Sequence, residues 1–143
     1  MIVLDTNVLS ELLRPTPEAH VLAWLERQPP ASVFTSAVTQ GEVLYRIRLL
    51  PDGKRRGRLW DAAVTIFNED FAGRVLSFDS DAAVAYAEIS AARRAAGRPI
   101  SQFDATIAAI ARSHGANLAT RNAKDFEGCG IEIVNPWRRR VSA

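Results

Sequence analysis

Four residues that are far apart in the sequence carry side-chain oxygens suited to binding a cation. They are Asp5, Glu42, Asp104 and Asn122. Oxygen donors without His or Cys favour Mg²⁺ over zinc, with Mn²⁺ as a substitute. The single Cys129 and the lack of zinc-type Cys/His spacing point the same way. We therefore expect a hard divalent cation whose shell is completed by water and by a substrate phosphate.

Two of these acids interrupt helical faces that are otherwise apolar. The apolar residues at helical spacing are Ile107, Ala108 and Ala111 for Asp104, and Val38, Tyr45 and Leu49 for Glu42. An isolated carboxylate is costly to bury, so each acid must be paired, protonated or bound to a metal. The departure from the apolar pattern marks both acids as site candidates.

Helix capping is the alternative explanation for these two acids. Ser101 precedes Asp104 by three residues, and Thr39 precedes Glu42 by the same spacing, so both pairs match a capping box. Ser36 offers a better helix start than Thr39, so capping accounts for Asp104 better than for Glu42. A cap and a ligand are also compatible, because the helix dipole favours an ionised carboxylate in the first turn.

The other candidates follow predicted strands. Asp5 comes directly after the apolar run Ile2–Leu4, and sites in open α/β sheets form beyond the carboxyl ends of strands. Its alternative role is to cap the next helix. Asn122 and Asp125 follow a strand predicted at 117–120, and their alternative role is to form a turn.

The elements that must position these residues alternate regularly along the chain. Strands are predicted at 2–4, 32–35, 74–78, 117–120 and 131–134, and helices near 8–14, 21–25, 37–50, 54–70, 80–97 and 102–114. This alternation predicts an α/β fold in which a parallel sheet has helices on both faces. No repeat or linker divides the sequence, so residues 1–143 are predicted to form one domain.

The overall composition is that of an ordinary globular protein, with 48% hydrophobic and 24% charged residues. The net charge of +2 allows an anionic partner. Basic clusters at 54–58 and 138–140 could follow a phosphate backbone, or could simply be solvated surface. No apolar stretch approaches the roughly 20 residues that span a bilayer, and no signal-peptide pattern is present. We therefore expect a cytoplasmic protein without a membrane partner.

Taken together, the motifs resemble those of the PIN-domain nucleases. They are Asp5-Thr6-Asn7, Glu42, Asp104 followed by 107–111, residues 97–100, residues 119–126, and Asn135-Pro136-Trp137. Each motif is weak alone, but their order and spacing extend nearly from end to end. Within these nucleases the sequence looks most like the VapC toxins of bacterial toxin–antitoxin pairs, in the FitB-like branch.

The resemblance implies a PIN-like three-layer sandwich with a five-stranded parallel sheet. It also implies a Mg²⁺-dependent endoribonuclease that cuts single-stranded or loop RNA. Asp5, Glu42 and Asp104 occupy the family's acidic positions, and Asn122 occupies the fourth, which is Asp in many relatives. Three possibilities stay open: Asn122 acts through its carbonyl oxygen, Asp125 compensates, or three acids suffice.

The resemblance further implies partners and a mechanism. The partners are a second copy of the chain and a VapB-like antitoxin, assembled as a heterotetramer or larger, with DNA contacted only through the antitoxin. Asp5 and Asp104 would ligate Mg²⁺, while Glu42 completes the site or orients the attacking water. Thr6 and Thr120 would hold the acids in position. Cleavage would leave a 5′-phosphate and a 3′-hydroxyl.

Three other classes of protein compete with this interpretation. A haloacid-dehalogenase-type phosphatase needs a second Asp two residues after the first, where Asn7 stands. A nucleotide-binding module needs a glycine-rich loop after a strand, and the sequence has none. A DNA-associated regulatory subunit with little nuclease activity would keep the PIN fold without the chemistry.

Overall fold

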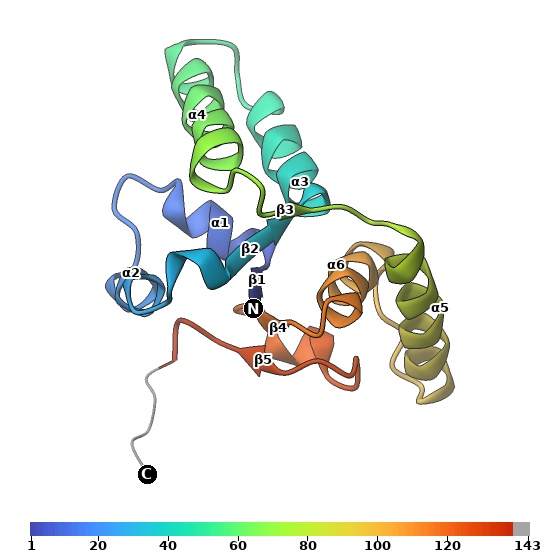
Figure 1. The fold of residues 1–143 in the computed structure, drawn as a ribbon. Coiled ribbons are helices and arrows are strands. Elements are labelled where there is room, and N and C mark those ends of the chain that lie inside the picture. Colours follow the sequence, from blue (N-terminus) through green and yellow to red (C-terminus); the bar gives the residue numbers. More distant parts are fainter. Residues whose placement is uncertain (139–143) are drawn as a thin grey trace.

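The apolar run at the amino terminus forms the central strand of the sheet. The computed structural model describes residues 1–138 and has five parallel strands in the order β3-β2-β1-β4-β5 (Figure 1). The strands are β1 (Ile2–Leu4), β2 (Val33–Ser36), β3 (Val75–Leu76), β4 (Asn117–Ala119) and β5 (Ile133–Val134). In β1, Ile2 lies opposite both Val33 and Asn117. Because all strands run the same way, their carboxyl ends meet at one edge of the sheet.

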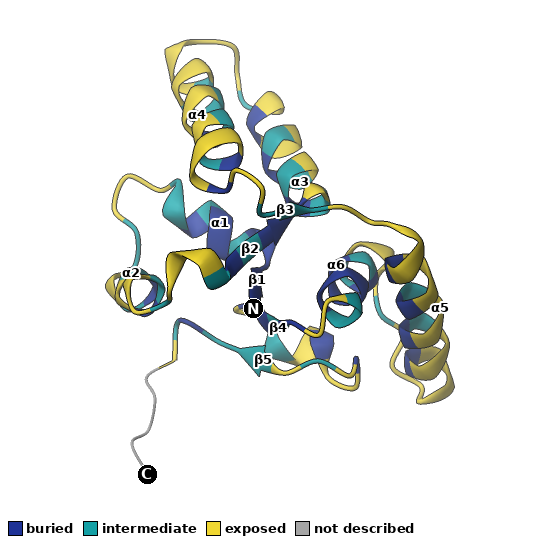
Figure 2. Ribbon diagram, in the orientation of Figure 1, coloured by how far each residue is buried: buried dark blue, intermediate teal, exposed yellow. Residues whose placement is uncertain are grey.

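Helices cover both faces of this sheet. In the described part of the chain they are α1 (Thr6–Leu12), α2 (Ala19–Glu26), α3 (Ala37–Arg48), α4 (Lys54–Thr65), α5 (Ser80–Ala95) and α6 (Gln102–Ser113). Side chains of β1 alternate between two cores: Ile2 and Leu4 pack with α1 to α4, whereas Val3 packs with α5 and α6. Figures 1 and 2 show the two helix groups on opposite sides of the sheet, in which β1 is buried. The predicted three-layer α/β fold is confirmed.

The helix predicted for residues 54–70 has two parts. The α-helix ends at Thr65, and a π-helical turn follows over Ile66–Asp70, in which the Phe71 amide donates to the Ile66 carbonyl at 2.9 Å. Phe67 and Phe71 are both buried. Their four-residue spacing suits an α-helix and a π-turn alike, which is why the apolar pattern did not separate the two.

The carboxyl-terminal basic tail is described only in part. Residues 139–143 lie outside the described residues, and with them Arg139 and Arg140 of the predicted cluster. Arg138 is exposed. Among residues 1–138, every helix is too short or too polar to cross a membrane.

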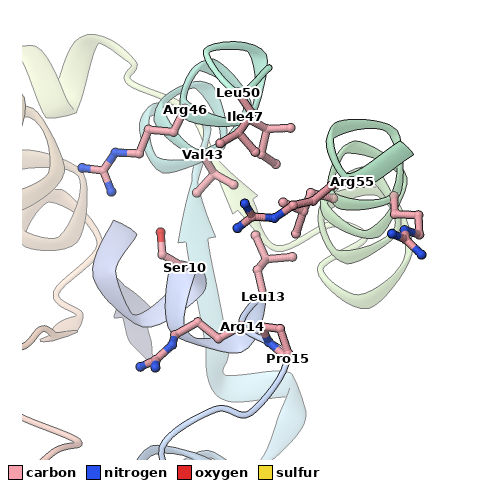
Figure 3. Close-up of a pocket in the computed structure, with 11 residues that line it drawn as sticks. Ser10, Leu13, Arg14, Pro15, Val43, Arg46, Ile47, Leu50 and Arg55 are labelled. Atoms are coloured by element: carbon pink, nitrogen blue, oxygen red, sulfur yellow. The ribbon is translucent and has the colours of Figure 1, made fainter. Parts of the chain in front are cut away.

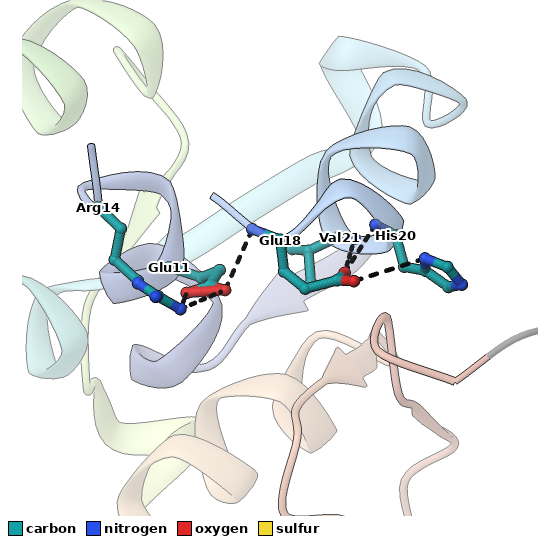
Figure 4. Close-up of polar contacts among 5 residues, drawn as sticks. All are labelled: Glu11, Arg14, Glu18, His20 and Val21. Carbon is teal, nitrogen blue, oxygen red and sulfur yellow. Dashed lines mark hydrogen bonds and ion pairs between the residues drawn. The ribbon is translucent and has the colours of Figure 1, made fainter. Parts of the chain in front are cut away.

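A buried carboxylate joins the end of α1 to the start of α2. Glu11 is only 5% exposed, and it accepts hydrogen bonds from the Arg14 guanidinium at 3.0 and 3.1 Å and from the Glu18 backbone amide at 3.2 Å (Figure 4). The Glu18 side chain in turn caps α2. Two prolines in the connection prevent one continuous helix. These hydrogen bonds therefore fix the orientation of α2 relative to α1.

Replacing Glu11 by Ala should lower the free energy of unfolding by about 2 kcal/mol, because the Glu18 amide and the Arg14 guanidinium lose their acceptor. Urea unfolding measures this change. The matched variant Glu26→Ala removes an exposed acid from α2 and should change stability by less than about 0.5 kcal/mol. Equal losses in the two variants would contradict a structural role for Glu11.

Candidate active site

Asp5 lies where the ends of β1 and β4 meet. Its backbone amide donates to the Ala119 carbonyl at 2.9 Å, which extends the pairing of the two strands by one residue. Its carboxylate accepts from the Thr6 amide at 2.8 Å, so Asp5 is the N-cap of α1. The second carboxylate oxygen accepts from the Thr120 hydroxyl, also at 2.8 Å. Asp5 therefore caps α1 and also lies at the strand ends where a site is expected.

Burial raises the pKa of Asp5 to about 6. The hydrogen bonds from Thr120 and Thr6 oppose this rise, whereas the charges of Asp104 and Glu42 add to it. Asp5 thus lies within electrostatic range of acids carried by α6 and α3. The fold brings together three carboxylates that are separated by as many as 99 residues in the sequence.

Asp104 lies in the first turn of α6, beside the N-cap Ser101. The Ser101 hydroxyl accepts from the Asp104 amide at 3.1 Å, so the predicted helix start is confirmed. The apolar face predicted for Ile107, Ala108 and Ala111 is buried. Partial burial raises the pKa of Asp104; the bond to Ser101 lowers it, Asp125 and Glu42 raise it, and Arg93 lowers it.

Glu42 occupies a different position on its helix from the one predicted. The N-cap of α3 is Ser36, so a capping box that starts at Thr39 is excluded. Tyr45 and Leu49, expected to share a buried face with Glu42, are 63% and 65% exposed, and that prediction was wrong. The face of α3 that packs on the core is formed by Thr39, Val43 and Ile47. Glu42 is half-buried at the margin of this face.

One ion pair of Glu42 is local. Its carboxylate accepts from the Arg46 guanidinium at 2.6 Å, one helical turn away. Arg46 is largely exposed, so solvent weakens the attraction between the two charges.

The segment after β4 carries two oxygen-bearing side chains, those of Asn122 and Asp125. Asn122 is exposed, and its backbone amide donates to the Thr120 hydroxyl at 3.1 Å. Asp125 lies in a 3₁₀ turn over Ala123–Phe126, and its charge raises the pKa of Asp104. Both residues do form a turn, as the alternative interpretation held.

Two positioning groups were missed in the sequence. The Asn7 side chain donates to the Asp5 carboxylate at 3.4 Å and to the Thr120 hydroxyl at 3.2 Å. The Thr6 hydroxyl contacts that of Thr39 at 3.2 Å and so links α1 to α3, while its backbone amide is the group that reaches Asp5. The role of Asn7 could have been inferred from the motif Asp5-Thr6-Asn7. The role of Thr39 could not, because its contact with Thr6 is visible only in the fold.

The donor chemistry of this cluster fits a hydrated hard cation. Across residues 1–138, no three His, Cys, Asp or Glu side chains stand close enough together to hold one ion directly. Two carboxylates with several waters would suffice, because Mg²⁺ in proteins usually keeps part of its hydration shell. Asp5 and Asp104 are suited to hold such an ion, and Glu42 to bind its waters.

Replacing Asp5 by Asn should stabilise the fold near neutral pH. The Asp5 pKa is about 6 in the folded state, against the ordinary aspartate value of 3.8 in the unfolded chain. Between these values the folded state binds more protons, so the free energy of unfolding falls as pH rises, by about 3 kcal/mol in all. Above pH 6 this penalty is constant, and below 3.8 it is absent.

We therefore expect Asp5→Asn to be more stable than the unchanged chain by about 2 kcal/mol near pH 7, and equally stable near pH 4. Urea unfolding in EDTA at the two pH values measures the difference. Glu132→Gln, which alters an exposed acid, should show little effect at either pH. An Asp5→Asn gain that did not vary with pH would contradict the electrostatic explanation.

Comparisons with known proteins identify the family to which the chain belongs. Residues 2–128 match the PIN-domain family. The chain is 42% identical to VapC ribonuclease Y4jK of Sinorhizobium fredii, over 96% of this chain and 98% of that protein. It is 39% identical to toxin FitB of Neisseria gonorrhoeae, over 96% of this chain and 99% of that protein.

A solved structure of FitAB bound to the IR36 DNA fragment superposes with a TM-score of 0.92 at 38% identity, covering 98% of both chains. The phosphatase and nucleotide-binding alternatives require other families. This chain belongs to the PIN-domain family.

Proposed function

We propose that this chain is the toxin of a type II toxin–antitoxin pair and acts as a Mg²⁺-dependent endoribonuclease on single-stranded or loop RNA. The observation that carries the proposal is the convergence of Asp5, Glu42 and Asp104 within electrostatic range at one edge of the sheet. The names of two relatives, VapC ribonuclease and toxin FitB, support the activity and the role.

In this proposal some side chains hold the cation and others orient the attacking water. Thr120 and Asn7 fix the Asp5 carboxylate, so that its oxygens do not need to reorganise when RNA binds. Asp5 and Asp104 would hold Mg²⁺, and Glu42 would accept a hydrogen bond from the attacking water and orient it. When bound, the cation supplies charge that stabilises the phosphate oxygens and lowers the pKa of a water molecule. In-line attack would leave a 5′-phosphate and a 3′-hydroxyl.

Asp104→Asn should reduce RNA cleavage by about 10²-fold or more, because it removes the charge of one of the two carboxylates that would hold the cation, and losing a group that only supports metal ligands already costs about 10–100-fold. Initial rates on a single-stranded RNA with added Mg²⁺ measure the loss, and EDTA should abolish cleavage. Asp81→Asn alters an exposed acid in the first turn of α5 and should cleave normally. Undiminished cleavage by Asp104→Asn, or in EDTA, would overturn the proposed mechanism.

We also infer that a VapB-like antitoxin binds in an apolar groove between α1, α3 and α4 (Figure 3). The groove has a volume of about 580 Å³, and its lining includes Leu13, Val43, Ile47, Leu50 and Leu59. Four arginines surround these apolar side chains: Arg14, Arg46, Arg55 and Arg58. Such a groove suits an amphipathic helix with acidic residues on its flanks. Contact with DNA would come through this antitoxin, and the homodimer stays a prediction.

Reversing two charges of the groove, in Arg55→Glu/Arg58→Glu, should weaken antitoxin binding by about tenfold or more while the free chain still cleaves RNA. Calorimetric titration with the cognate antitoxin measures the affinity. Arg94→Glu reverses an exposed charge on α5, across the sheet, and should bind normally. Equal affinity in all three proteins would place the antitoxin elsewhere.

A further inference from the structure

One buried arginine ties together the two segments that carry Asp104 and Asp125. Arg93 projects from the last turn of α5 and is 8% exposed. Its guanidinium donates to the carbonyl of Arg98 at 2.7 Å, which lies in the connection leading to α6 and Asp104. It also donates to the carbonyls of Asp125 and Glu127 at 2.9 and 2.8 Å, in the segment after β4.

The bonding partners of Arg93 make its burial unusual. The hydrogen bonds of its guanidinium go to neutral groups: three backbone carbonyls and, at 3.8 Å, the sulfur of Cys129. A buried cation without a directly bonded anion is costly unless its field acts on charges nearby. Asp104 is such a charge, because Arg93 acts on it electrostatically.

The segment after β4 is anchored on both sides of Asp125. On one side, the Asp125 amide donates to the Asn122 carbonyl at 3.0 Å, and the Asn122 amide donates to the Thr120 hydroxyl that holds Asp5. On the other side, Phe126 is 1% exposed in the core beneath α6. With Arg93 bonded to its carbonyl, the backbone of Asp125 has little freedom to move relative to α6, which carries Asp104.

Asp125 and Asn122 differ in their electrostatic effect on the active-site acids. Of the acidic side chains that act on Asp104, Asp125 has a larger effect than Glu42. Asn122 is exposed, and its hydrogen bonds to other described residues are made by its backbone. The amide side chain at this position also lacks the charge that would attract a cation.

We propose that Asp125 is the fourth acidic group of the active site, and that Arg93 is the positioning residue that holds Asp125 beside Asp104. Arg93 does so through the backbone of the segment after β4, and its charge offsets part of the repulsion among the carboxylates. This inference rests on the proposed function, because it assigns Asp125 to the same cation site. It gives Asn122 a role in shaping the turn.

The direct test of Asp125 is cation binding without RNA. Mn²⁺ affinity of the full chain is measured from the electron paramagnetic resonance signal of free Mn²⁺, with Mg²⁺ as competitor. Asp125→Asn should weaken binding by about tenfold, and Asn122→Ala should weaken it less. Glu127→Gln removes an exposed acid from the same segment and serves as the matched control. A larger loss in Asn122→Ala than in Asp125→Asn would overturn the assignment.

The test of Arg93 is a double-mutant cycle. Lysine keeps the charge but cannot donate to all the carbonyls that the guanidinium reaches, so Arg93→Lys should weaken Mn²⁺ binding by about tenfold. If Arg93 acts through Asp125, the double variant Arg93→Lys/Asp125→Asn should bind no more weakly than Asp125→Asn. Hydrogen exchange of the amides of residues 123–129 should be faster in Arg93→Lys.

If Arg93 only stabilises the fold, the variants should show a different combination of Mn²⁺ affinity and hydrogen exchange. Exchange would then be faster in Arg93→Lys while Mn²⁺ affinity stayed unchanged, and additive losses in the cycle would equally contradict positioning through Asp125. Failure of the proposed function gives a distinct result, because the unchanged chain would then neither bind Mn²⁺ nor cleave RNA. That result would overturn both proposals, whereas normal cleavage with an unaffected Asp125→Asn would overturn this one alone.

Discussion

The candidate active site depends on one buried hydrogen bond, from the Thr120 hydroxyl to the Asp5 carboxylate. It joins the residues that follow β4 and β1, at 2.8 Å, around a carboxylate that is 5% exposed. Burial opposes ionisation of Asp5, and the hydrogen bonds donated by Thr120 and Thr6 partly offset this effect. Asp5 is therefore held firmly and still ionises near neutral pH. Those two properties suit a cation ligand better than a packing residue.

Three helix starts reinforce this arrangement. The N-caps of α1, α3 and α6 are Asp5, Ser36 and Ser101, and all three follow or face the same edge of the sheet. The amino-terminal end of a helix stabilises a nearby anion by about 0.3–1 kcal/mol, mainly within the first turn. Asp5 and Asp104 lie within that range. Glu42 lies in the second turn of α3, and its nearby counter-charge is Arg46.

Local sequence patterns were enough to predict the fold. Strands buried on both faces are short apolar runs, and helix starts carry recognisable caps, so Ser36 and Ser101 were identifiable in advance. Glu42 was selected by a faulty argument, since periodicity tells which residues share a face but not which face meets the core. Tyr45 and Leu49 share the side of Glu42 and face solvent.

The remaining positioning groups could not be predicted because their partners are distant in sequence. The Thr120–Asp5 bond spans 115 residues, and the bonds of Arg93 to the segment after β4 span 32 and 34. Arg93 stands in an alanine-rich helix beside another arginine, a pattern typical of a solvated surface. Burial of a cation becomes visible only once the carbonyls that surround it are known.

The charge balance of the site explains why stability and cation binding should be coupled. The charges of Asp104 and Glu42 raise the cost of ionising Asp5, and those of Asp125 and Glu42 raise the cost of ionising Asp104. Arg93 offsets only part of this repulsion, because its hydrogen bonds are to neutral groups. Near neutral pH the remainder is a penalty of the folded state that the unfolded chain does not bear. A cation that binds only the folded state relieves this repulsion. The free energy of unfolding lost to repulsion in the empty site is therefore regained on binding, and it contributes to the affinity for the cation.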